Sequence, residues 1–179
     1  VDRAISELRR GRYVVVRGSN ASAALILAAE GVTPDNLEGL ALSAGAPVRL
    51  TITSRRARVL KIAQPKGRII TLSTEPALSA EIVDQISDPA ETFAAQSLCF
   101  SYHETATYDS ESAAVALTKL ARLLPAALTA PIQATYADDL EAWSSRHDLF
   151  LIDSGDVFQY EKTAARTLCR VSEAKVPLA

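Results

Sequence analysis

The sequence predicts a single α/β (α+β) domain in which helices cover a mixed β-sheet. Segments with helical periodicity alternate along the chain with short runs of β-branched residues, a pattern typical of layered folds that combine helices and sheet. Residues 23–29 are apolar at every position, as expected for a strand buried on both faces. With 179 residues, 48% of them hydrophobic, the chain is long enough for one substantial core and short for two.

Local signals set the bounds of the predicted elements. Thr33 and Pro34 provide an N-cap and a proline at the first helical position, and Gly45 marks the end of that helix. A polar loop is predicted over His103–Asp109. Helices are predicted around Ile5 and Leu8, over Pro34–Ser43, Ser54–Ile62, Leu78–Ile86, Glu111–Leu123 and Asp138–His147, and from about Ser154. Strands are predicted over Tyr13–Val16, 23–29, Val48–Thr53, Gly67–Ser73, Leu98–Tyr102 and Leu149–Ile152, and from Pro125 through Ile132.

The composition favours neither nucleic acid nor a membrane as a partner. Lys and Arg number 19 and Asp and Glu number 21, so the net charge of -2 creates no strong field. No apolar run approaches the roughly 18 to 20 residues that cross a bilayer, and the first residues are too charged for a secretory signal, so we expect a cytoplasmic protein. Cys99 and Cys169 lie far apart without CxxC spacing, which favours buried free thiols. The sequence contains no methionine, which suggests a fragment of a longer gene product.

Several segments, in this order, resemble those of a known enzyme family. They are Arg12–Arg17, 25–35 with its Ala-Ala-Glu and Thr-Pro-Asp, Thr53–Ile62, Ile86–Pro89, and the long helix from Glu111 with the strand that follows it. Together they resemble the 3,4-dihydroxy-2-butanone-4-phosphate synthase family of riboflavin biosynthesis. The resemblance implies that residues 1–163 form a domain with that family's fold. It also implies a homodimer, because members of the family are homodimers.

The resemblance implies that the family's catalytic positions are replaced in this chain. Arg17–Ala24 stands where the family has an acidic loop whose carboxylates bind magnesium, and it contains no carboxylate. Ser110 stands in place of a metal-binding histidine, and Pro131 in place of a catalytic glutamate. The family's Thr-Thr-Gly-Ile-Ser segment, which helps to hold the substrate phosphate, has no clear match between Ile69 and Ser101.

These replacements predict a catalytically inactive domain, because the loss of one well-placed acid or base typically costs a factor of about a hundred to ten thousand in rate. We therefore expect no catalytic residue, metal ion or cofactor in this domain, although active members of the family use magnesium. Residues 164–179 are expected to form the end of the C-terminal helix and a linker, and Ser172–Leu178 resembles the linker to GTP cyclohydrolase II, to which this domain is often fused. The expected role is structural, dimerising or regulatory within a GTP cyclohydrolase II-type protein.

Two alternatives stay open. In the first, the domain binds a phosphorylated metabolite through Arg17, Arg49 or Arg55, or has a rebuilt active site. In the second, residual synthase activity on ribulose 5-phosphate depends on His103 and Glu104, the one histidine and carboxylate pair that might replace the lost metal site, although a solvated loop explains these residues as well.

Other candidate sites have simpler explanations. Asp138 and Asp139 with His147 suggest a metal site, but acids at the start of a helix usually interact with its dipole. Trp143 and Leu140 are spaced as a buried helix face. Several serines lack an adjacent base and therefore do not form a hydrolase site: Ser19, Ser22, Ser110 and Ser112. One basic run might bind an anion but is more typical of a solvated helix face: Arg55, Arg56, Arg58, Lys61, Lys66 and Arg68.

Overall fold

The computed structural model describes residues 1–19, 22–75, 77–90, 99–133 and 139–167. Its strands are β1 (Val14–Arg17), β2 (Ala23–Ala28), β3 (Arg49–Thr53), β4 (Ile69–Glu75), β5 (Cys99–Glu104), β6 (Ala126–Pro131) and β7 (Phe150–Asp153). Its helices are α1 (Asp2–Arg9), α2 (Pro34–Ala44), α3 (Ser54–Val59), α4 (Ala80–Ser87), α5 (Ser110–Leu120), α7 (Leu140–Arg146) and α8 (Ser154–Thr167).

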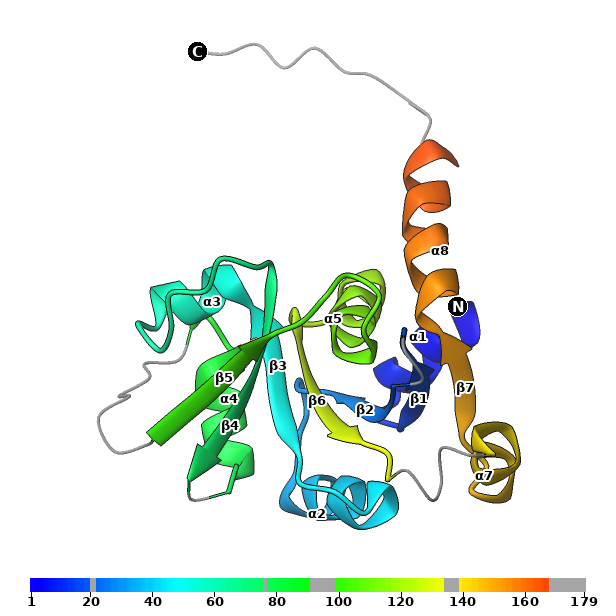
Figure 1. Ribbon diagram of the computed structural model, residues 1–179, viewed down its shortest axis with the longest axis horizontal. Helices are drawn as coiled ribbons and strands as arrows, with labels where there is room; N and C mark the ends of the chain where they lie inside the picture. Colours follow the sequence, from blue (N-terminus) through cyan, green and yellow to red (C-terminus); the bar gives the residue numbers. More distant parts are fainter. Residues whose placement is uncertain (20–21, 76, 91–98, 134–138, 168–179) are drawn as a thin grey trace, which may run out of the picture.

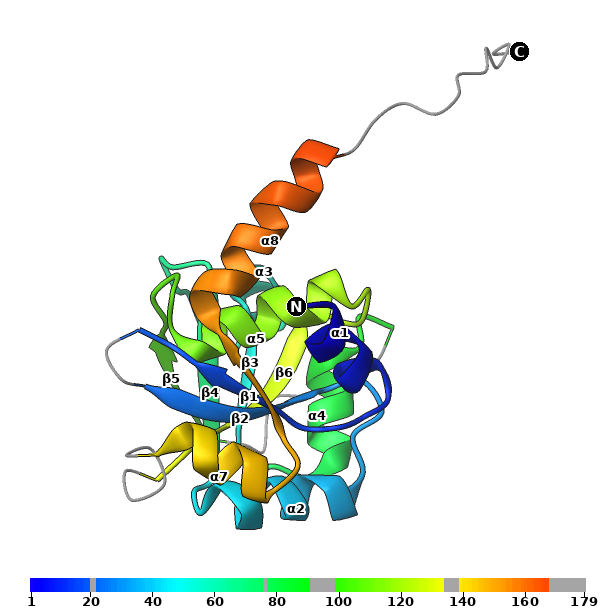
Figure 2. The same cartoon turned by 90° about the vertical axis from the view of Figure 1, so that its right-hand side faces the viewer.

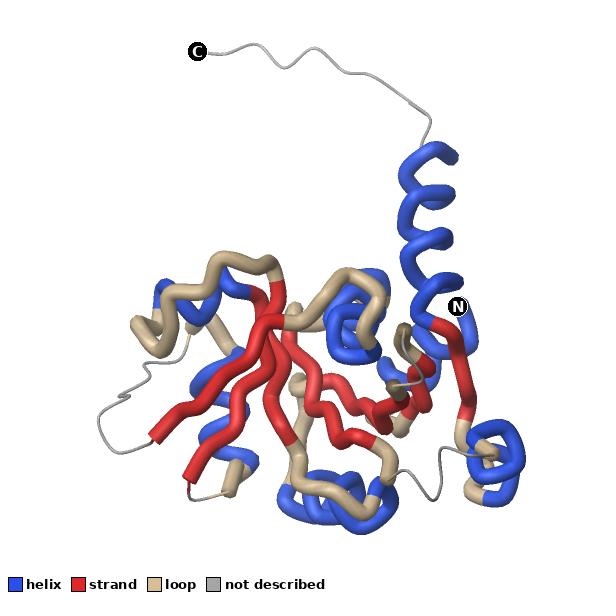
Figure 3. Tube along the Cα trace, in the orientation of Figure 1, coloured by secondary structure: helices blue, strands red, loops and turns tan. Residues whose placement is uncertain are grey.

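The strands form one seven-stranded mixed sheet in the order β5-β4-β3-β6-β2-β1-β7. The pair β1 and β7 is parallel, and the other neighbouring strands are antiparallel. Helices lie on both sides of the sheet (Figure 3), as buried side chains on both of its faces require. This arrangement confirms the predicted α/β class with a mixed sheet covered by helices.

Two hydrophobic clusters, one on each face of the sheet, form the core. On one face, side chains of α2, α3, α4 and α7 pack against alternate residues of the strands. On the other face, α1, α5 and the start of α8 pack against the remaining alternate residues. Trp143 and Leu140 of α7 are buried in the first cluster, which confirms the prediction that they belong to the core. Helix α8 projects from the rest of the molecule in both views (Figures 1 and 2).

Three buried threonine hydroxyls lie inside the second face of the sheet. The hydroxyl of Thr51 is 2.9 Å from that of Thr71 and 3.0 Å from that of Thr129. These bonds join β4, β3 and β6 through side chains as well as through the backbone ladder, and they satisfy hydroxyls that would be costly to bury alone.

The ends of α2 follow the signals in its sequence. Thr33 accepts a hydrogen bond from the amide of Asn36, and the side chain of Asn36 accepts one from the amide of Thr33. Gly45 ends the helix with a φ of 69°, a left-handed conformation that favours glycine. The predicted helix Pro34–Ser43 is therefore confirmed to within one residue.

Some predicted bounds were wrong. The polar loop predicted over His103–Asp109 starts later, because His103 and Glu104 belong to the edge strand β5. Helix α3 ends at Val59, and Lys61 adopts a left-handed φ of 57°, so the helix does not continue to Ile62. Cys99 is exposed, contrary to the predicted buried thiol, because β5 is an edge strand whose side chains are open to solvent. Cys169 lies outside the described residues.

Two tyrosines connect elements through their hydroxyls. The hydroxyl of Tyr13 donates to the carbonyl of Asn36 at 2.8 Å, and burial raises the pKa of Tyr13 above its ordinary value. The hydroxyl of Tyr160 in α8 donates to Asp2 at 2.6 Å, and this hydrogen bond, followed by the charge of Asp2, raises the pKa of Tyr160. The second bond attaches α8 to the start of α1.

Arg56 stabilises the end of α4, although its sequence context suggested a solvated helix face. Its guanidinium donates to the carbonyls of Ile86 at 2.6 Å, Gln85 at 3.2 Å and Asp88 at 2.7 Å. The last carbonyls of a helix have no partner within the helix, and a positive charge there also interacts favourably with the helix dipole.

We expect Arg56→Ala to lower the free energy of unfolding by about 1.5 to 3 kcal/mol, the usual range for hydrogen bonds from a charged group. Urea denaturation measures this change. Arg55→Ala is the matched control, because Arg55 is exposed on the same helix and makes no hydrogen bond or ion pair with the described residues. The control should stay within about 0.5 kcal/mol of the parent chain. Equal effects of the two substitutions would show that the Arg56 contacts contribute nothing.

The part of the chain that the structure describes contains no helix long and apolar enough to cross a membrane.

Candidate functional site

The fold brings the three replaced positions together at one edge of the sheet. Arg17 ends β1 and pairs with Ala23 of β2, and the next residue, Ala24, pairs with Pro131 at the end of β6. Between β1 and β2, Gly18 lies against the backbone of Ser110 at the start of α5. The turn after β1, the N-terminus of α5 and the end of β6 are therefore neighbours, and we call this place the 18–110–131 edge.

Hydrogen bonds hold the turn after β1 against the start of α5. The amide of Ser19 donates to the carbonyl of Tyr108 at 2.9 Å, and its hydroxyl donates to Asp109 at 3.0 Å. The second carboxylate oxygen of Asp109 accepts from the amide of Ala106 at 2.7 Å. One oxygen of this carboxylate thus joins the turn to the loop before α5, and the other accepts a bond within that loop. Asp109 makes no side-chain bond to its own helix.

Gly18 is required by this close approach. A Cβ atom on Gly18 would lie 2.5 Å from the backbone nitrogen of Ser110 and 2.4 Å from the hydroxyl of Ser22. The serine hydroxyl can rotate away, but a backbone atom at the start of a buried helix cannot move without disturbing the core. The turn therefore lies directly on α5.

The oxygen donors at this edge do not match a magnesium site. Magnesium prefers octahedral coordination by hard oxygen ligands, commonly with one or two carboxylates. The turn offers serine hydroxyls, and Pro131 offers no side-chain donor. Of the two nearby carboxylates, Asp109 is engaged as above and Glu111 accepts from the hydroxyl of Ser110 at 2.9 Å. Among the described residues, no three His, Cys, Asp or Glu side chains are grouped so that they could hold a metal ion.

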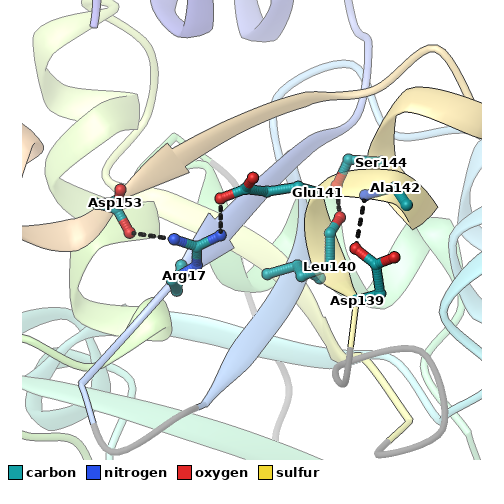
Figure 4. Close-up of polar contacts among 7 residues, drawn as sticks. All are labelled: Arg17, Asp139, Leu140, Glu141, Ala142, Ser144 and Asp153. Carbon is teal, nitrogen blue, oxygen red and sulfur yellow. Dashed lines mark hydrogen bonds and ion pairs between the residues drawn. The ribbon is translucent and has the colours of Figure 1, made fainter.

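Arg17, a predicted phosphate ligand, is neutralised by carboxylates. Its guanidinium lies 3.0 Å from Glu141 of α7 and 3.5 Å from Asp153 of β7 (Figure 4). In Figure 4 the two carboxylates approach the guanidinium from different sides, and the chain places them far from Arg17 in sequence. An anion at Arg17 would have to displace these partners, so this arginine is a weak phosphate site.

Arg17, Arg49 and Arg55 do not converge. The C-terminal ends of β1 and β6 lie beside the N-terminal end of β3. Arg17 and Arg49 therefore lie at the same ends of the strands, with β2 and β6 between them. Arg55 follows the other end of β3, on the opposite edge. Arg49 lines a cavity of about 550 Å³ between α2 and α4, which Leu37 and Leu78 also line. It forms no ion pair with the described residues, although Glu38 lines the same cavity.

His103 and Glu104 are consecutive residues of β5, and consecutive side chains of a strand project to opposite faces of the sheet. The carboxylate of Glu104 accepts from the amides of Lys66 and Gly67, each at 2.8 Å. Strand geometry therefore gives the two side chains no common position for a metal ion, and Glu104 already fixes the loop before β4.

Asp139, the acid before α7 that the structure describes, has a local role. Asp139 is the N-cap of α7 and accepts from the amide of Ala142 at 3.1 Å, as acids at helix starts commonly do. His147 follows that helix, and its ring lies 4.8 Å from that of Trp143 between centroids. Asp138 lies outside the described residues.

The sequence did not reveal the partners of Arg17 or the role of Asp109. Each involves contacts between segments that are distant in sequence, such as Ser19 with Asp109 and Arg17 with Glu141. A periodic pattern reports only which face of an element is buried, so neither contact leaves a local signal.

Comparison with known proteins gives both a fold and a relative. The chain is 36% identical to a GTP cyclohydrolase-2 of Azospirillum brasilense over 180 residues, which is 99% of this chain and 46% of that protein. The chain therefore spans a little under half the length of this relative. No protein-family model matches the chain.

Solved structures of 3,4-dihydroxy-2-butanone 4-phosphate synthases share the fold. RibBX, a two-domain synthase from A. baumannii, has a TM-score of 0.73 at 17% identity, over 90% of this chain and 57% of that one. The synthase of Candida albicans has a TM-score of 0.70 at 19% identity, over 89% of this chain and 96% of that one. A synthase in complex with two magnesium ions has a TM-score of 0.71 at 20% identity, over 93% and 98%.

Proposed function

We propose that this chain is a catalytically inactive synthase-like domain. It has the fold of 3,4-dihydroxy-2-butanone 4-phosphate synthases, and it is similar along its length to part of a GTP cyclohydrolase-2. It acts as a structural, dimerising or regulatory module of a GTP cyclohydrolase II-type protein in riboflavin biosynthesis. A GTP cyclohydrolase II-like part is fused to it in the parent protein, as the similarity to just under half of a GTP cyclohydrolase-2 supports.

The observation that carries the proposal is the convergence of the replaced positions. Positions taken independently from three distant segments meet at the 18–110–131 edge, as positions of one ancestral active site should. None of them presents an acid or base: they are a glycine and serine turn, a serine whose hydroxyl donates to Glu111, and a proline. Catalysis by proton transfer needs a titratable group within hydrogen-bonding reach of the substrate. The two carboxylates near this edge, Asp109 and Glu111, already accept hydrogen bonds from neighbouring protein groups, and the replaced positions themselves supply no acid or base.

The side-chain oxygens at this edge do not match the ligands that magnesium prefers, so we infer no catalytic step that uses magnesium. We therefore expect the domain to work without a metal ion or cofactor. A homodimer is the expected assembly by resemblance, and the molar mass from light scattering tests it: twice the mass of one chain supports a dimerising role, and a monomer at all concentrations contradicts it.

A second candidate function is the binding of a phosphorylated metabolite, and the position of Arg49 favours it. This arginine is half-buried at a cavity of about 550 Å³, a volume within the usual range for small-molecule sites. Its guanidinium has no carboxylate partner among the described residues, in contrast to that of Arg17.

Calorimetric titration of the purified chain with ribulose 5-phosphate and with GTP, with and without magnesium, separates the two candidates. No binding supports the structural role. The second candidate is supported by binding of either ligand without turnover. Arg49→Ala should then weaken that binding by about tenfold or more, because it removes a hydrogen bond from a charged group. Arg55→Ala is the control, because Arg55 lies on the opposite edge of the sheet and should leave binding unchanged.

A further inference from the structure

A second cavity lies between α5, α8 and the loops next to β4 and β5, and it has a volume of about 510 Å³. It shares no lining residue with the Arg49 cavity, and it adjoins the 18–110–131 edge at Ala106 and Ser112. Along α5 it is lined by Ser112 and Lys119, which lie on one face of the helix at i and i+7. Phe158 and Glu161 of α8 line the opposite side.

Two cations that form no ion pair with the described residues line this cavity, together with one carboxylate, that of Glu161. Arg68 precedes β4 and Lys119 lies in the last turn of α5, and both side chains are exposed. Neither forms an ion pair with any carboxylate of the residues that the structure describes. Two unpaired cations from different elements on one concave surface favour an anion that bears more than one charge.

A pair of hydroxyls adds a hydrogen-bond donor. The hydroxyls of Thr105 and Ser112 lie 2.7 Å apart, and Ser112 is nearly buried. Each hydroxyl carries one proton and the bond between them uses one, so the pair retains one proton for a further acceptor. Both residues line the cavity.

The loop that carries Arg68 is held firmly. The carboxylate of Glu104 accepts from the amides of Lys66 and Gly67, and a Cβ atom on Gly67 would lie 2.8 Å from that carboxylate. The carbonyl of Arg68 accepts from the amide of Ser54 at 2.9 Å. A pre-ordered loop binds a ligand with a smaller entropic cost than a loop that must order on binding.

The charge of the chain is unevenly distributed around this loop. Residues 39–74 contain seven of the 19 basic residues and none of the 21 acidic ones. Arg68 therefore lies in a basic stretch of an otherwise acidic chain, and that stretch adds a long-range attraction for anions to the local contacts.

We propose that this cavity binds a small hydroxyl-bearing phosphomonoester, with its phosphate at Arg68 and Lys119. A phosphomonoester carries a charge of about -1.5 to -2 near neutral pH, which matches two cations. The remaining hydroxyl proton of the Thr105 and Ser112 pair donates to a phosphate oxygen. Glu161 accepts from hydroxyls of the ligand, and Phe158 contacts its body, so an organic phosphate fits better than the inorganic ion.

The test uses the purified 179-residue chain with 5′-AMP and glycerol phosphate as probes, and adenosine and inorganic phosphate as comparisons, at constant ionic strength. Calorimetry gives the affinity, and amide NMR shifts in residues 67–69 and 116–119, away from the 18–110–131 edge, locate the site. We expect saturable binding of an organic phosphate and weaker binding of adenosine and of inorganic phosphate. Arg68→Ala and Lys119→Ala should each lower the affinity for the organic phosphate by about tenfold or more, because each removes a hydrogen bond from a charged group. Thermal unfolding verifies that both variants fold.

Arg58→Ala is the matched control, because Arg58 is an exposed cation of the same basic stretch that does not line the cavity. Arg58 attracts the ligand only through a long-range interaction that salt screens, so Arg58→Ala should change the affinity by less than twofold. The proposal is overturned by an absence of saturable binding of either probe in the millimolar range, by equal binding of adenosine, or by equal losses in Arg58→Ala and the cavity variants. The Arg68→Ala and Lys119→Ala variants separate this site from the 18–110–131 edge, which contains neither residue.

Discussion

Leu128→Ala is expected to lower the free energy of unfolding by about 2 to 5 kcal/mol, the range for a leucine replaced in a packed core. Leu128 is fully buried in β6, the strand between β3 and β2, and it lies opposite Leu50 on one side and Leu27 on the other. Removal of its side chain leaves a cavity at the centre of the sheet, where the surrounding backbone is fixed on both sides and cannot collapse inward.

Thermal or urea denaturation measures this loss. For a chain of this length, each kcal/mol corresponds to a fall of roughly 2 to 4 °C in Tm. Leu42→Ala makes the same chemical change in α2, where the side chain is 74% exposed, and it should stay within about 0.5 kcal/mol of the parent chain. Similar losses in the two variants would contradict the packing described for β6.

Gly18→Ala is expected to destabilise the protein by about 1 to 3 kcal/mol, the usual cost of forcing extra atoms into a packed site. The new Cβ would lie 2.5 Å from the backbone nitrogen of Ser110, so either the turn or the start of α5 must move. Movement of the turn would also lengthen the bonds from Ser19 to Tyr108 and Asp109.

Gly155→Ala is the matched control for this substitution. Gly155 lies in α8, and a Cβ there would meet nothing within 4 Å. Because alanine is favoured over glycine within a helix by roughly 0.5 to 1 kcal/mol, this variant should be unchanged or slightly more stable. If Gly18→Ala were as stable as Gly155→Ala, the turn after β1 would not lie against α5, and the 18–110–131 edge would be more open than described.

Much of the fold could be predicted from the sequence where local chemistry decides it. Thr33, Pro34 and Gly45 defined α2 because capping and left-handed conformations depend on residue type. Strand β2 was evident because it is buried on both faces. The strand order has no such signal, since it depends on which segments pack together after folding.

The errors have physical causes as well. The predicted strand near Tyr102 stopped too early because β5 is an edge strand with exposed side chains, so polar His103 and Glu104 showed no alternation. The positions of the candidate site came from the resemblance to a family rather than from periodicity. Their convergence, the pairing of Arg17 with Glu141 and Asp153, and the Arg49 cavity depend on tertiary contacts.

We propose that the 18–110–131 edge has lost the groups that the synthase reaction needs. The most direct measurement is formation of 3,4-dihydroxy-2-butanone 4-phosphate from ribulose 5-phosphate by the purified chain with magnesium, beside the Candida albicans synthase as a positive control. We predict no product above the enzyme-free blank, because each missing acid or base typically costs a factor of about a hundred to ten thousand. Magnesium-dependent product formation by this chain would contradict the claim.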